Sequence, residues 1–544
     1  MNAKYLFTLC ILFALLLTAC SPRVVTQAPA ATEALMEVPV EVVRTVEVQM
    51  LAIEAPPEPR FQPQQPIAVQ PQVIQPEPTQ PDLPPPGLVP LPIDNFFRDY
   101  GLNPFEDTLE DHYSTFGLDV DTASYSVARS YVMDGNLPPA EAVRLEEFVN
   151  YFDQGYASPQ GVAFAVYADG APSPLHKDGT YLLRIGVQGY QVPESARKPV
   201  SLTFVIDTSG SMEHDGRLEL VKAALTLLVD ELGPQDSVAI IAYNTQASLL
   251  LPSTSVADRQ LILRQIKRLR PSGSTNADAG LTLGYQTAMQ AFLPGGTNRV
   301  ILCSDGVANT GDTTSEAILA KVRGYVEEGI TLTTIGVGMG NFNDILLERL
   351  ADDGNGFYAY VDDIDEARKV FVEDLVSTLE VIARDAKVQV DFNPDVVAYY
   401  RLLGYENRAV ADQDFRNDAV DAGELGAGHS ATALYAIYLR PQADGRIATV
   451  QLRWEDPESY QITEINGNIN TWDLEDYFYD TDPHYQLAVL VSYYAEMLRE
   501  SPWVNDFSLY QIHRLVETVA TQLSDDPDVA EFHFLVERAS EMHW

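Results

Sequence analysis

Cysteine and basic residues are both scarce in this chain of 544 residues. The three cysteines, Cys10, Cys20 and Cys303, are too few for a disulfide framework. The 35 lysines and arginines are outnumbered by 78 aspartates and glutamates, which gives a formal net charge of −43. A chain of this charge repels nucleic acid and anionic lipid head groups, and it attracts divalent cations and basic protein surfaces. We therefore expect no nucleic-acid partner, although the same charge also suits a plain solvated surface.

Recognisable catalytic motifs are lacking as well. The sequence has no Walker phosphate loop, no HExxH zinc motif and no paired CxxC, and its 8 histidines are scattered. The segment 428–432 (GHSAT) lacks the second glycine of a nucleophile elbow. In the segment 336–341 (GVGMGN), Asn341 stands where a dinucleotide-binding fingerprint requires glycine. We interpret the first segment as a turn before a strand and the second as a loop after one.

One further segment, 119–122 (DVDT), resembles the nucleophile loop of haloacid-dehalogenase-type phosphatases. The region around it is too short to supply the α/β fold which that chemistry needs. We favour a helix cap formed by Asp121 or Thr122 instead. The sequence thus predicts that the protein is not an enzyme, and a metal-dependent envelope hydrolase is kept as the alternative.

The amino terminus has the pattern of a secretory signal. Lys4 precedes an apolar run, residues 5–17, which is too short to span a membrane. The run ends in the sequence LTAC at residues 17–20, which resembles the lipobox of bacterial lipoproteins. That resemblance implies cleavage before Cys20 and acylation of this residue. We expect an extracytoplasmic protein that is lipid-anchored to the bacterial cell membrane or outer membrane. An ordinary signal peptide or an uncleaved anchor are the alternatives.

Residues 21–92 follow the expected signal peptide (1–20) and are rich in Pro, Gln, Val and Glu. The stretch 81–87 (PDLPPPG) can form neither a helix nor a central strand. We interpret 21–92 as a disordered tether, which at ~3.1 Å per residue could extend on the order of 200 Å.

Strands and helices alternate across residues 199–380. Short apolar, β-branched runs predict strands, and apolar residues at helical spacing predict the helices between them. This alternation is typical of a mostly parallel sheet that is covered by helices on both faces. The expected strands are 200–206, 237–243, 299–304, 330–335 and 356–360, and the expected helices are 217–231, 259–269, 281–292, 315–328, 344–351 and 364–379.

Carboxylates and hydroxyls gather where the strands of this sheet should end. Asp207 and Asp305 each follow a predicted strand, and a loop rich in Gly and Ser occupies 271–276. In open α/β sheets, ligands bind beyond the carboxyl ends of the strands, where the strand order reverses. Hard oxygen donors of this kind suit Mg²⁺, Mn²⁺ or Ca²⁺.

At these positions the chain resembles the von Willebrand factor A domain with its metal-ion-dependent adhesion site. The segment 207–211 (DTSGS) matches the DxSxS signature of that site, and Thr275 and Asp305 match its other two parts. The resemblance implies a Rossmann-like fold and a divalent ion, with Mg²⁺ favoured and Mn²⁺ or Ca²⁺ possible. It also implies that Ser209, Ser211 and Thr275 bind the ion directly, while Asp207 and Asp305 act mainly through water or hydrogen bonds. A partner's Asp or Glu would complete the coordination.

The flanking regions have other patterns. We expect a small helical module at 93–160, with helices at 121–133 and 139–152, and a mainly helical region at 456–544. Short alternating strands at 161–198 and at 385–455 predict one β-sandwich that is assembled from both sides of the A domain. The segments 119–125, 137–139 and 144–147 resemble the amino-terminal domain of a family of bacterial envelope proteins that also have a carboxyl-terminal domain of unknown function.

These observations predict an α/β protein: a von Willebrand A domain flanked by a helical module, a β-sandwich and a helical carboxyl-terminal region. They further predict a membrane-anchored binding protein for adhesion or for scaffolding of an envelope complex. Its metal site would consist of Asp207, Ser209, Ser211, Thr275 and Asp305. The sequence contains no pattern that specifies the oligomeric state.

Overall fold

The computed structural model describes residues 95, 97–118, 120–306, 315–339, 343–374, 380–418, 420 and 422–542, which all belong to one compact unit. The expected signal peptide, the tether and Cys20 lie outside these residues. In the part of the chain that the structure describes, no helix is both long enough and apolar enough to cross a membrane.

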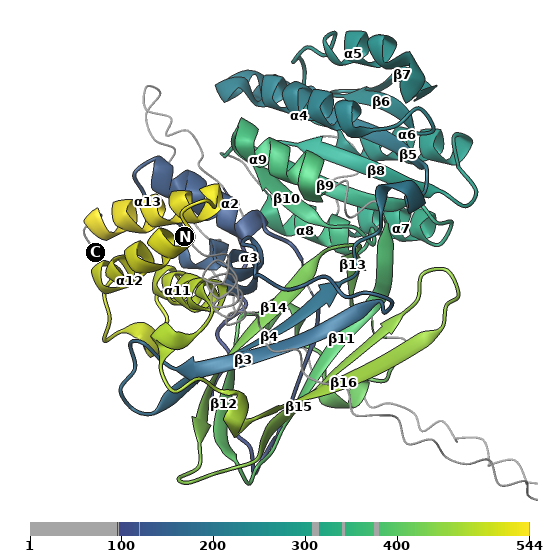
Figure 1. Ribbon diagram of the computed structural model, residues 1–544. Coiled ribbons are helices and arrows are strands. Elements are labelled where there is room, and N and C mark those ends of the chain that lie inside the picture. Colours follow the sequence, from purple (N-terminus) through teal and green to yellow (C-terminus); the bar gives the residue numbers. More distant parts are fainter. Residues whose placement is uncertain are drawn as a thin grey trace, which may run out of the picture. The chain divides into compact units, whose positions relative to one another are not determined.

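A six-stranded sheet forms the centre of the α/β domain (Figure 1). Its strand order is β10-β9-β8-β5-β6-β7, and every neighbouring pair is parallel except β6 and β7. The strands are β5 (Val200–Asp207), β6 (Ser237–Tyr243), β7 (Ala247–Ser255), β8 (Thr297–Ser304), β9 (Thr331–Val337) and β10 (Tyr358–Val361). The predicted fold class, an α/β protein with a mostly parallel sheet and additional antiparallel sheets, is confirmed.

Helices cover both faces of this sheet because successive side chains of a strand point to opposite faces. In β5, Phe204 and Ile206 pack with residues of α4, α5 and α9, whereas Val205 packs with residues of α6, α7 and α8. These helices are α4 (Arg217–Glu231), α5 (Arg259–Ile266), α6 (Ala277–Gln290), α7 (Ser315–Val326), α8 (Asp344–Asp352) and α9 (Ile364–Arg368), which continues as the π-helical η5 (Lys369–Asp374).

Two features of the α/β domain differ from the prediction. The edge strand β7 was not predicted, because much of it is exposed and it lacks the apolar run of a buried strand. The predicted helix 364–379 changes from α-helical to π-helical at Lys369, and its last five residues lie outside the described ranges.

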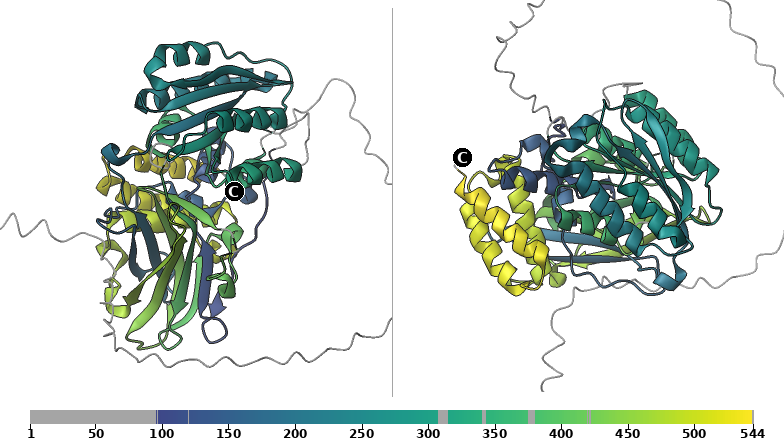
Figure 2. Two further views of the ribbon diagram at one scale, coloured as in Figure 1. Left: turned by 90° about the vertical axis from the view of Figure 1, so that its right-hand side faces the viewer. Right: turned by 90° about the horizontal axis from the view of Figure 1, so that it is seen from above.

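A sandwich of two antiparallel sheets is built from sequence on both sides of the α/β domain. One sheet has the order β1-β12-β14-β4-β3, and in the other β13, β11, β15 and β16 pair in turn while β2 joins β11. Figure 2 gives two further views of these strands. The strands are β1 (Glu106–Asp107), β2 (Tyr113–Gly117), β3 (Phe164–Pro172), β4 (Thr180–Gly189), β11 (Val381–Phe392), β12 (Val397–Leu403), β13 (Gly423–Gly426), β14 (Ser430–Leu439), β15 (Arg446–Glu455) and β16 (Ile462–Asn470).

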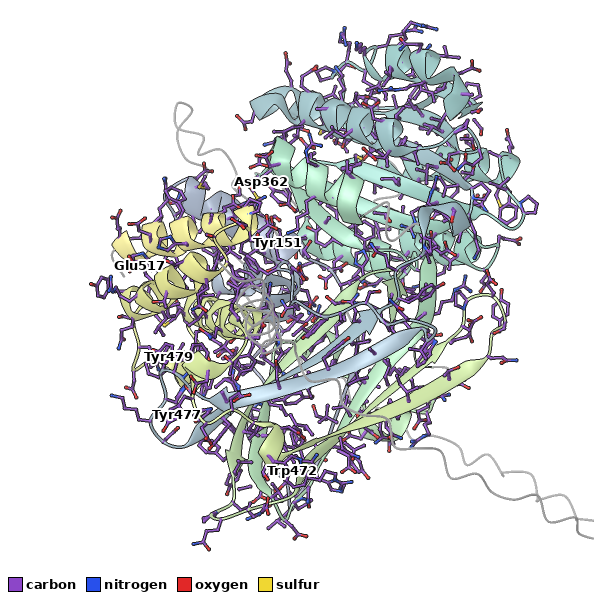
Figure 3. The ribbon with its side chains drawn as sticks, viewed as in Figure 1. Tyr151, Asp362, Trp472, Tyr477, Tyr479 and Glu517 are labelled. Carbon is purple, nitrogen blue, oxygen red and sulfur yellow. The ribbon has the colours of Figure 1, made fainter. Side chains whose placement is uncertain are left out.

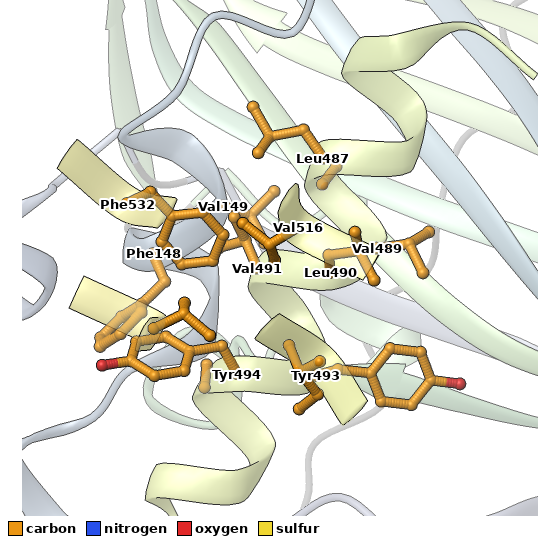
Figure 4. Close-up of a cluster of buried hydrophobic side chains, with 14 of the residues drawn as sticks. Phe148, Val149, Leu487, Val489, Leu490, Val491, Tyr493, Tyr494, Val516 and Phe532 are labelled. Atoms are coloured by element: carbon orange, nitrogen blue, oxygen red, sulfur yellow. The ribbon is translucent and has the colours of Figure 1, made fainter. Parts of the chain in front are cut away.

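Helices from the two ends of the described chain share one core (Figure 4). Phe148 and Val149 of α3 pack there with Val516 of α12 and Phe532 of α13, together with most of α11. The helices are α2 (Ala123–Met133), α3 (Leu145–Asn150), α11 (Pro483–Leu498), α12 (Leu509–Gln522) and α13 (Pro527–Glu541). Single 3-10 turns include η1 (Ala140–Ala142), η4 (Val256–Asp258) and η10 (Pro502–Val504), and the longer 3-10 segment η3 (Gly210–Gly216) is interrupted by the non-helical His214 and Asp215.

The region 93–160, predicted to be a small helical module, contains α2 and α3 but also two strands. These are β1 and β2, which pair with β12 and β11 of the sandwich. The predicted helix 139–152 is interrupted, since Val143 and Arg144 are extended between η1 and α3. Helices this short cannot bury a core alone, so they pack on the carboxyl-terminal helices instead. At the other end, β16 extends the sandwich beyond residue 455, into the region predicted to be mainly helical.

Buried arginines join the amino-terminal helices to the α/β domain. Arg144, just before α3, forms ion pairs with Glu147 of the same helix and with Asp344 of α8. Tyr358 of β10 donates its hydroxyl hydrogen to the same Asp344, at 2.9 Å. Burial by itself would lower the pKa of Arg144, but Asp344 and Glu147 outweigh burial and raise it well above its usual value.

Arg129 of α2 forms the second junction. Its guanidinium binds Asp362 and Glu366, which lie at the end of β10 and in α9, and also Glu531 of α13. Tyr151 adds a hydrogen bond of 2.8 Å to Glu366, and Figure 3 shows Tyr151 and Asp362 where these parts meet. The last helix of the α/β domain is therefore fastened to helices from both ends of the described chain.

Candidate metal site

The strand order of the α/β sheet reverses beside β5. The chain leaves β5 for β6 on one side and later returns to the other side through β8. Asp207 is the last residue of β5, and Asp305 directly follows β8, so the two carboxylates flank this reversal. This is the edge at which ligands bind in open α/β sheets.

Asp207 is completely buried and is held by two hydrogen bonds. Its Oδ1 accepts the backbone N–H of Ser209 at 2.8 Å, and its Oδ2 accepts the hydroxyl of Ser304 at 3.0 Å. Burial, reinforced by the nearby negative charge of Asp305, raises the pKa of Asp207 to about 6. The protein groups around Asp207 therefore balance the negative charge of its ionised side chain incompletely, and a bound cation would balance the remainder.

Three side-chain oxygens connect the loop after β5 to the end of β8. The Ser209 and Ser211 hydroxyl oxygens lie 3.0 Å apart, and the Ser211 hydroxyl donates to Asp305 Oδ1 at 3.0 Å. Two adjacent ligands of an octahedral Mg²⁺ at 2.0–2.1 Å would be about 3 Å apart. The spacing of the two hydroxyls thus fits a small, hard divalent ion.

The loop that contains Thr275 is hydrogen-bonded to the loop that follows Asp207. Gly210 donates its N–H to Gly273 O at 3.0 Å, and Ser272 donates to Thr208 O at 2.7 Å. Asn276 then begins α6 by accepting the N–H of Ala279 at 3.0 Å. Thr275 itself is buried between these two fixed points. The structure therefore places the end of β5, the loops 208–211 and 271–276 and the residue after β8, which contain the five predicted site residues, at one edge of the sheet.

Arg217 also belongs to this edge, although no sequence pattern pointed to it. Its Nη1 donates to Asp305 Oδ2 at 2.8 Å, and its Nη2 donates to Met339 O at 2.5 Å. Gly338 has φ +75°, and a Cβ at this residue would lie 2.2 Å from Arg217 Nε. The glycine in the loop after β9 thus makes room for an arginine that orients Asp305. From the sequence alone, Arg217 looked like an ordinary first residue of a helix.

Other residues that the sequence analysis considered lie elsewhere. Asp121 does not cap α2: it accepts the N–H of Tyr358 at 2.8 Å and pairs with Arg408. Thr122 occupies the cap position without a side-chain hydrogen bond, and Asp119 is outside the described residues. Ser430 begins β14 after a turn, and Cys303 is buried in β8, where burial raises its pKa to about 12.

Comparison with known proteins gives three family matches. The description "von Willebrand factor" matches residues 93–184, "von Willebrand factor type A domain" matches 201–393, and "Uncharacterized protein YfbK, C-terminal" matches 377–445. A relative from Escherichia coli, described as "Uncharacterized protein YfbK", is 35% identical over 476 residues, which cover 81% of this chain and 80% of the relative. The chain belongs to the YfbK family of von Willebrand factor A domain proteins.

More distant relatives match smaller parts of this YfbK family member. Human inter-alpha-trypsin inhibitor heavy chain H2 is 29% identical over 169 residues, which are 29% of this chain and 17% of the human protein. A solved structure, "von Willebrand factor type A from Catenulispora acidiphila", is 17% identical and covers 62% of this chain and 81% of its own, with a TM-score of 0.39. Proteins with von Willebrand A domains commonly mediate protein–protein interactions.

Proposed function

We propose that this protein is an extracytoplasmic binding protein that uses a divalent ion to engage acidic groups on a protein partner. Ser209, Ser211 and Thr275 would hold the ion, and Asp207 and Asp305 would orient its water ligands and balance its charge. The ion would supply an electrophilic position that a carboxylate from outside can occupy. Adhesion and scaffolding of an envelope complex are the roles that suit this chemistry.

The observation that carries the proposal is the grouping of the buried Asp207, two serine hydroxyls and Asp305 at one edge of the sheet. A fully buried carboxylate beside a second carboxylate, with two serine hydroxyls 3.0 Å apart in the adjoining loop, is a costly arrangement for the protein alone. A small divalent cation is the simplest group that would stabilise it. Mg²⁺ fits this oxygen spacing, and Mn²⁺ has the same ligand preference.

We propose binding without catalysis. The hydrogen bonds of Asp207, Ser209, Ser211 and Asp305 described above connect these residues to serines, to an arginine and to the backbone. A hydrolase would instead need a general base beside the position where a nucleophile could bind. We further propose that Cys20 carries a lipid anchor and that residues 21–92 connect this anchor to the folded unit.

Thermal and urea unfolding of the full chain in detergent, with Mg²⁺, Mn²⁺, Ca²⁺ or EDTA, tests the metal site. An ion at 100 times its dissociation constant should add about 2.7 kcal/mol to the free energy of unfolding. Asp207→Ala and Thr275→Ala should fold but lose this gain. Thr254→Ala is a matched control, because Thr254 lies on β7 and its hydroxyl bonds locally, to Pro252 O.

Partner binding needs a second measurement. Immobilised full chain should retain envelope proteins when Mg²⁺ is present and release them in EDTA, and the Thr275→Ala protein should retain none of them. If no ion stabilises the wild type, or if Thr275→Ala responds as the wild type does, the metal-mediated mechanism is wrong.

A further inference from the structure

The carboxyl-terminal helices α12 and α13 form a rigid hairpin. Ser508 begins α12 with a capping box, and Asp526 begins α13 by accepting two backbone N–H groups. Ile512, Val516 and Phe532 anchor the two helices in the shared core, and Figure 4 shows the last two of these residues. Side chains along the seam between α12 and α13 therefore have a fixed backbone spacing.

Two histidines meet on this seam. His513 follows Ile512 in α12, His533 follows Phe532 in α13, and both are half-buried. Their Nε2 atoms lie 3.2 Å apart, and the two ring planes differ by only 14°. This distance is that of a hydrogen bond between the two rings, and the tautomers set which nitrogen donates.

The same distance suits two ligands of one metal ion. Two imidazole nitrogens about 2.0–2.1 Å from a tetrahedral ion lie roughly 3.3 Å apart. A rotation of each ring would direct the lone pairs of both nitrogens at an ion in place of this hydrogen bond. Imidazole favours Zn²⁺, Cu²⁺ and Ni²⁺ over the hard ions that suit hydroxyls and carboxylates. We propose that His513 and His533 form a second metal site, which binds a late first-row divalent ion through two histidines.

Two glutamates and two arginines lie near the histidine pair. Glu517 and Glu537 each follow one of the histidines by four residues, which places them on the same helix faces. Glu517 lies at the outer surface of the helical bundle (Figure 3) and pairs with Arg514 at 2.7 Å. The guanidinium of Arg538 is bound to the carbonyls of Val132 and Met133. The net charge of −43 also raises the concentration of cations near the surface.

The site would be open. Among the described residues, no group of three or more His, Cys, Asp or Glu side chains could hold a metal ion. Two protein ligands leave further coordination positions for water or for a donor from another molecule, in contrast to a closed structural zinc centre. The inference is independent of the proposed oxygen-ligand site, because it rests on other residues, another domain and another class of ion.

Cu²⁺ and Zn²⁺ titrations of the full chain in detergent, with excess Mg²⁺ present, test this site. Calorimetry should show one Zn²⁺ or Cu²⁺ per chain, and the Cu²⁺ EPR spectrum should show coupling to two imidazole nitrogens. His513→Gln and His533→Gln should each weaken binding by at least about tenfold, since even the loss of an outer-shell partner costs that much. In each variant only one nitrogen coupling should remain.

His112→Gln is the matched control. His112 is partly exposed and bonds to Asp391 on the sandwich, so its replacement should leave the titration unchanged. Glutamine can still form hydrogen bonds, and the far-UV circular dichroism of each variant checks that it folds. For a variant that does not fold, protection of His513 and His533 from diethylpyrocarbonate by Zn²⁺ in the wild type replaces the comparison. Equal binding by wild type and folded variants, absence of binding, or absence of protection would each overturn the proposal.

Discussion

Two groups of buried carboxylates in the α/β domain are treated very differently by the fold. Where α8 and α9 meet the amino-terminal helices, a region called the flank below, Asp344 and Glu366 are buried. Each of them pairs with an arginine from the amino-terminal region. At the carboxyl edge of the sheet, Asp207 is just as deeply buried, but among the described residues it forms no ion pair. Its neighbours are hydroxyls, a backbone N–H and a second carboxylate, Asp305, which pairs with Arg217.

Whether a buried carboxylate has a cationic partner inside the chain distinguishes a structural role from a role in binding a ligand. Carboxylates that are compensated within the chain fasten one part of the molecule to another, and they leave nothing for a ligand to neutralise. A carboxylate that the fold leaves undercompensated lowers the stability of the protein until a cation arrives. Four substitutions test this contrast, and they follow from the largest expected effect to the smallest.

Arg144→Ala should have the largest effect. It leaves Glu147 and Asp344 buried without their cation, which should lower the free energy of unfolding by about 3–5 kcal/mol. Urea unfolding of the full chain in detergent measures this loss, and Arg144→Lys should restore only part of it because lysine lacks the forked geometry. A loss below about 1 kcal/mol would mean that the flank pairs do not fasten the domain.

Asp207→Asn should act in the opposite direction when metal is removed. Because the folded pKa of Asp207 is raised from 3.8 to about 6, the folded protein binds more protons than the unfolded chain between these values. Asp207 should therefore contribute a fall of about 3 kcal/mol to wild-type stability in EDTA as pH rises through this window. Asp362, whose pKa burial also raises to about 6, contributes a similar fall to both proteins. The asparagine side chain of the variant carries no charge, so the variant should show the smaller fall and should be the more stable protein at about pH 7.5 in EDTA.

Urea unfolding in EDTA from about pH 4 to about pH 7.5 measures both proteins across this window. Addition of Mg²⁺ should stabilise the wild type and leave Asp207→Asn unchanged. Parallel pH profiles for the two proteins would show that Asp207 is compensated after all, and the contrast with the flank would then disappear.

Gly338→Ala should have an intermediate effect. The new Cβ would meet Arg217 Nε at 2.2 Å, so the arginine must move away from Asp305. Gly295→Ala is a matched control, since Gly295 has a similar φ of +76° but open space around its Cβ position. Gly338→Ala should cost about 1–2 kcal/mol more than the control in thermal unfolding, and it should weaken Mg²⁺ binding. Equal losses would exclude a role for the contact with Arg217.

Arg514→Ala should have the smallest effect. Arg514 and Glu517 form an ion pair on α12 in which both side chains are about half exposed. Solvent screening limits such a pair to roughly 0.5 kcal/mol or less, which urea unfolding should confirm. A loss comparable to that of Arg144→Ala would show that burial is not what distinguishes the flank arginines.

Much of the α/β domain was predictable, because its apolar strands and amphipathic helices have clear periodicities. The bounds of β6 and of α4 agree with the prediction at both ends. The strands β1, β2, β7 and β16 were missed. β2 has five residues, and it is a strand because Phe116 pairs with Val388, which is distant in the sequence. Local patterns cannot specify pairs of this kind, since the stabilising contacts come from another part of the chain.

The five candidate metal-site residues were named from their spacing and from a family resemblance, and the strand order then placed them at one edge of the sheet. Arg217 and Ser304 could not be assigned to the site in this way. Their importance depends on which atoms they approach, Asp305 Oδ2 and Asp207 Oδ2, and arginine and serine are common at helix starts and strand ends. The His513–His533 pair likewise depends on how two separate helices pack.

The sequence by itself determined the alternation of strands and helices and the chemical types of the oxygen donors, because both depend on residue identity and local spacing. Only the tertiary structure decided which carboxylates find a cation inside the protein. Arg129 reaches Glu366 across 237 positions of the sequence, and Arg144 reaches Asp344 across 200. Asp207, in contrast, is left with hydroxyls and a second carboxylate. Charge compensation is a matter of distance and burial in three dimensions, and spacing along the chain does not encode it.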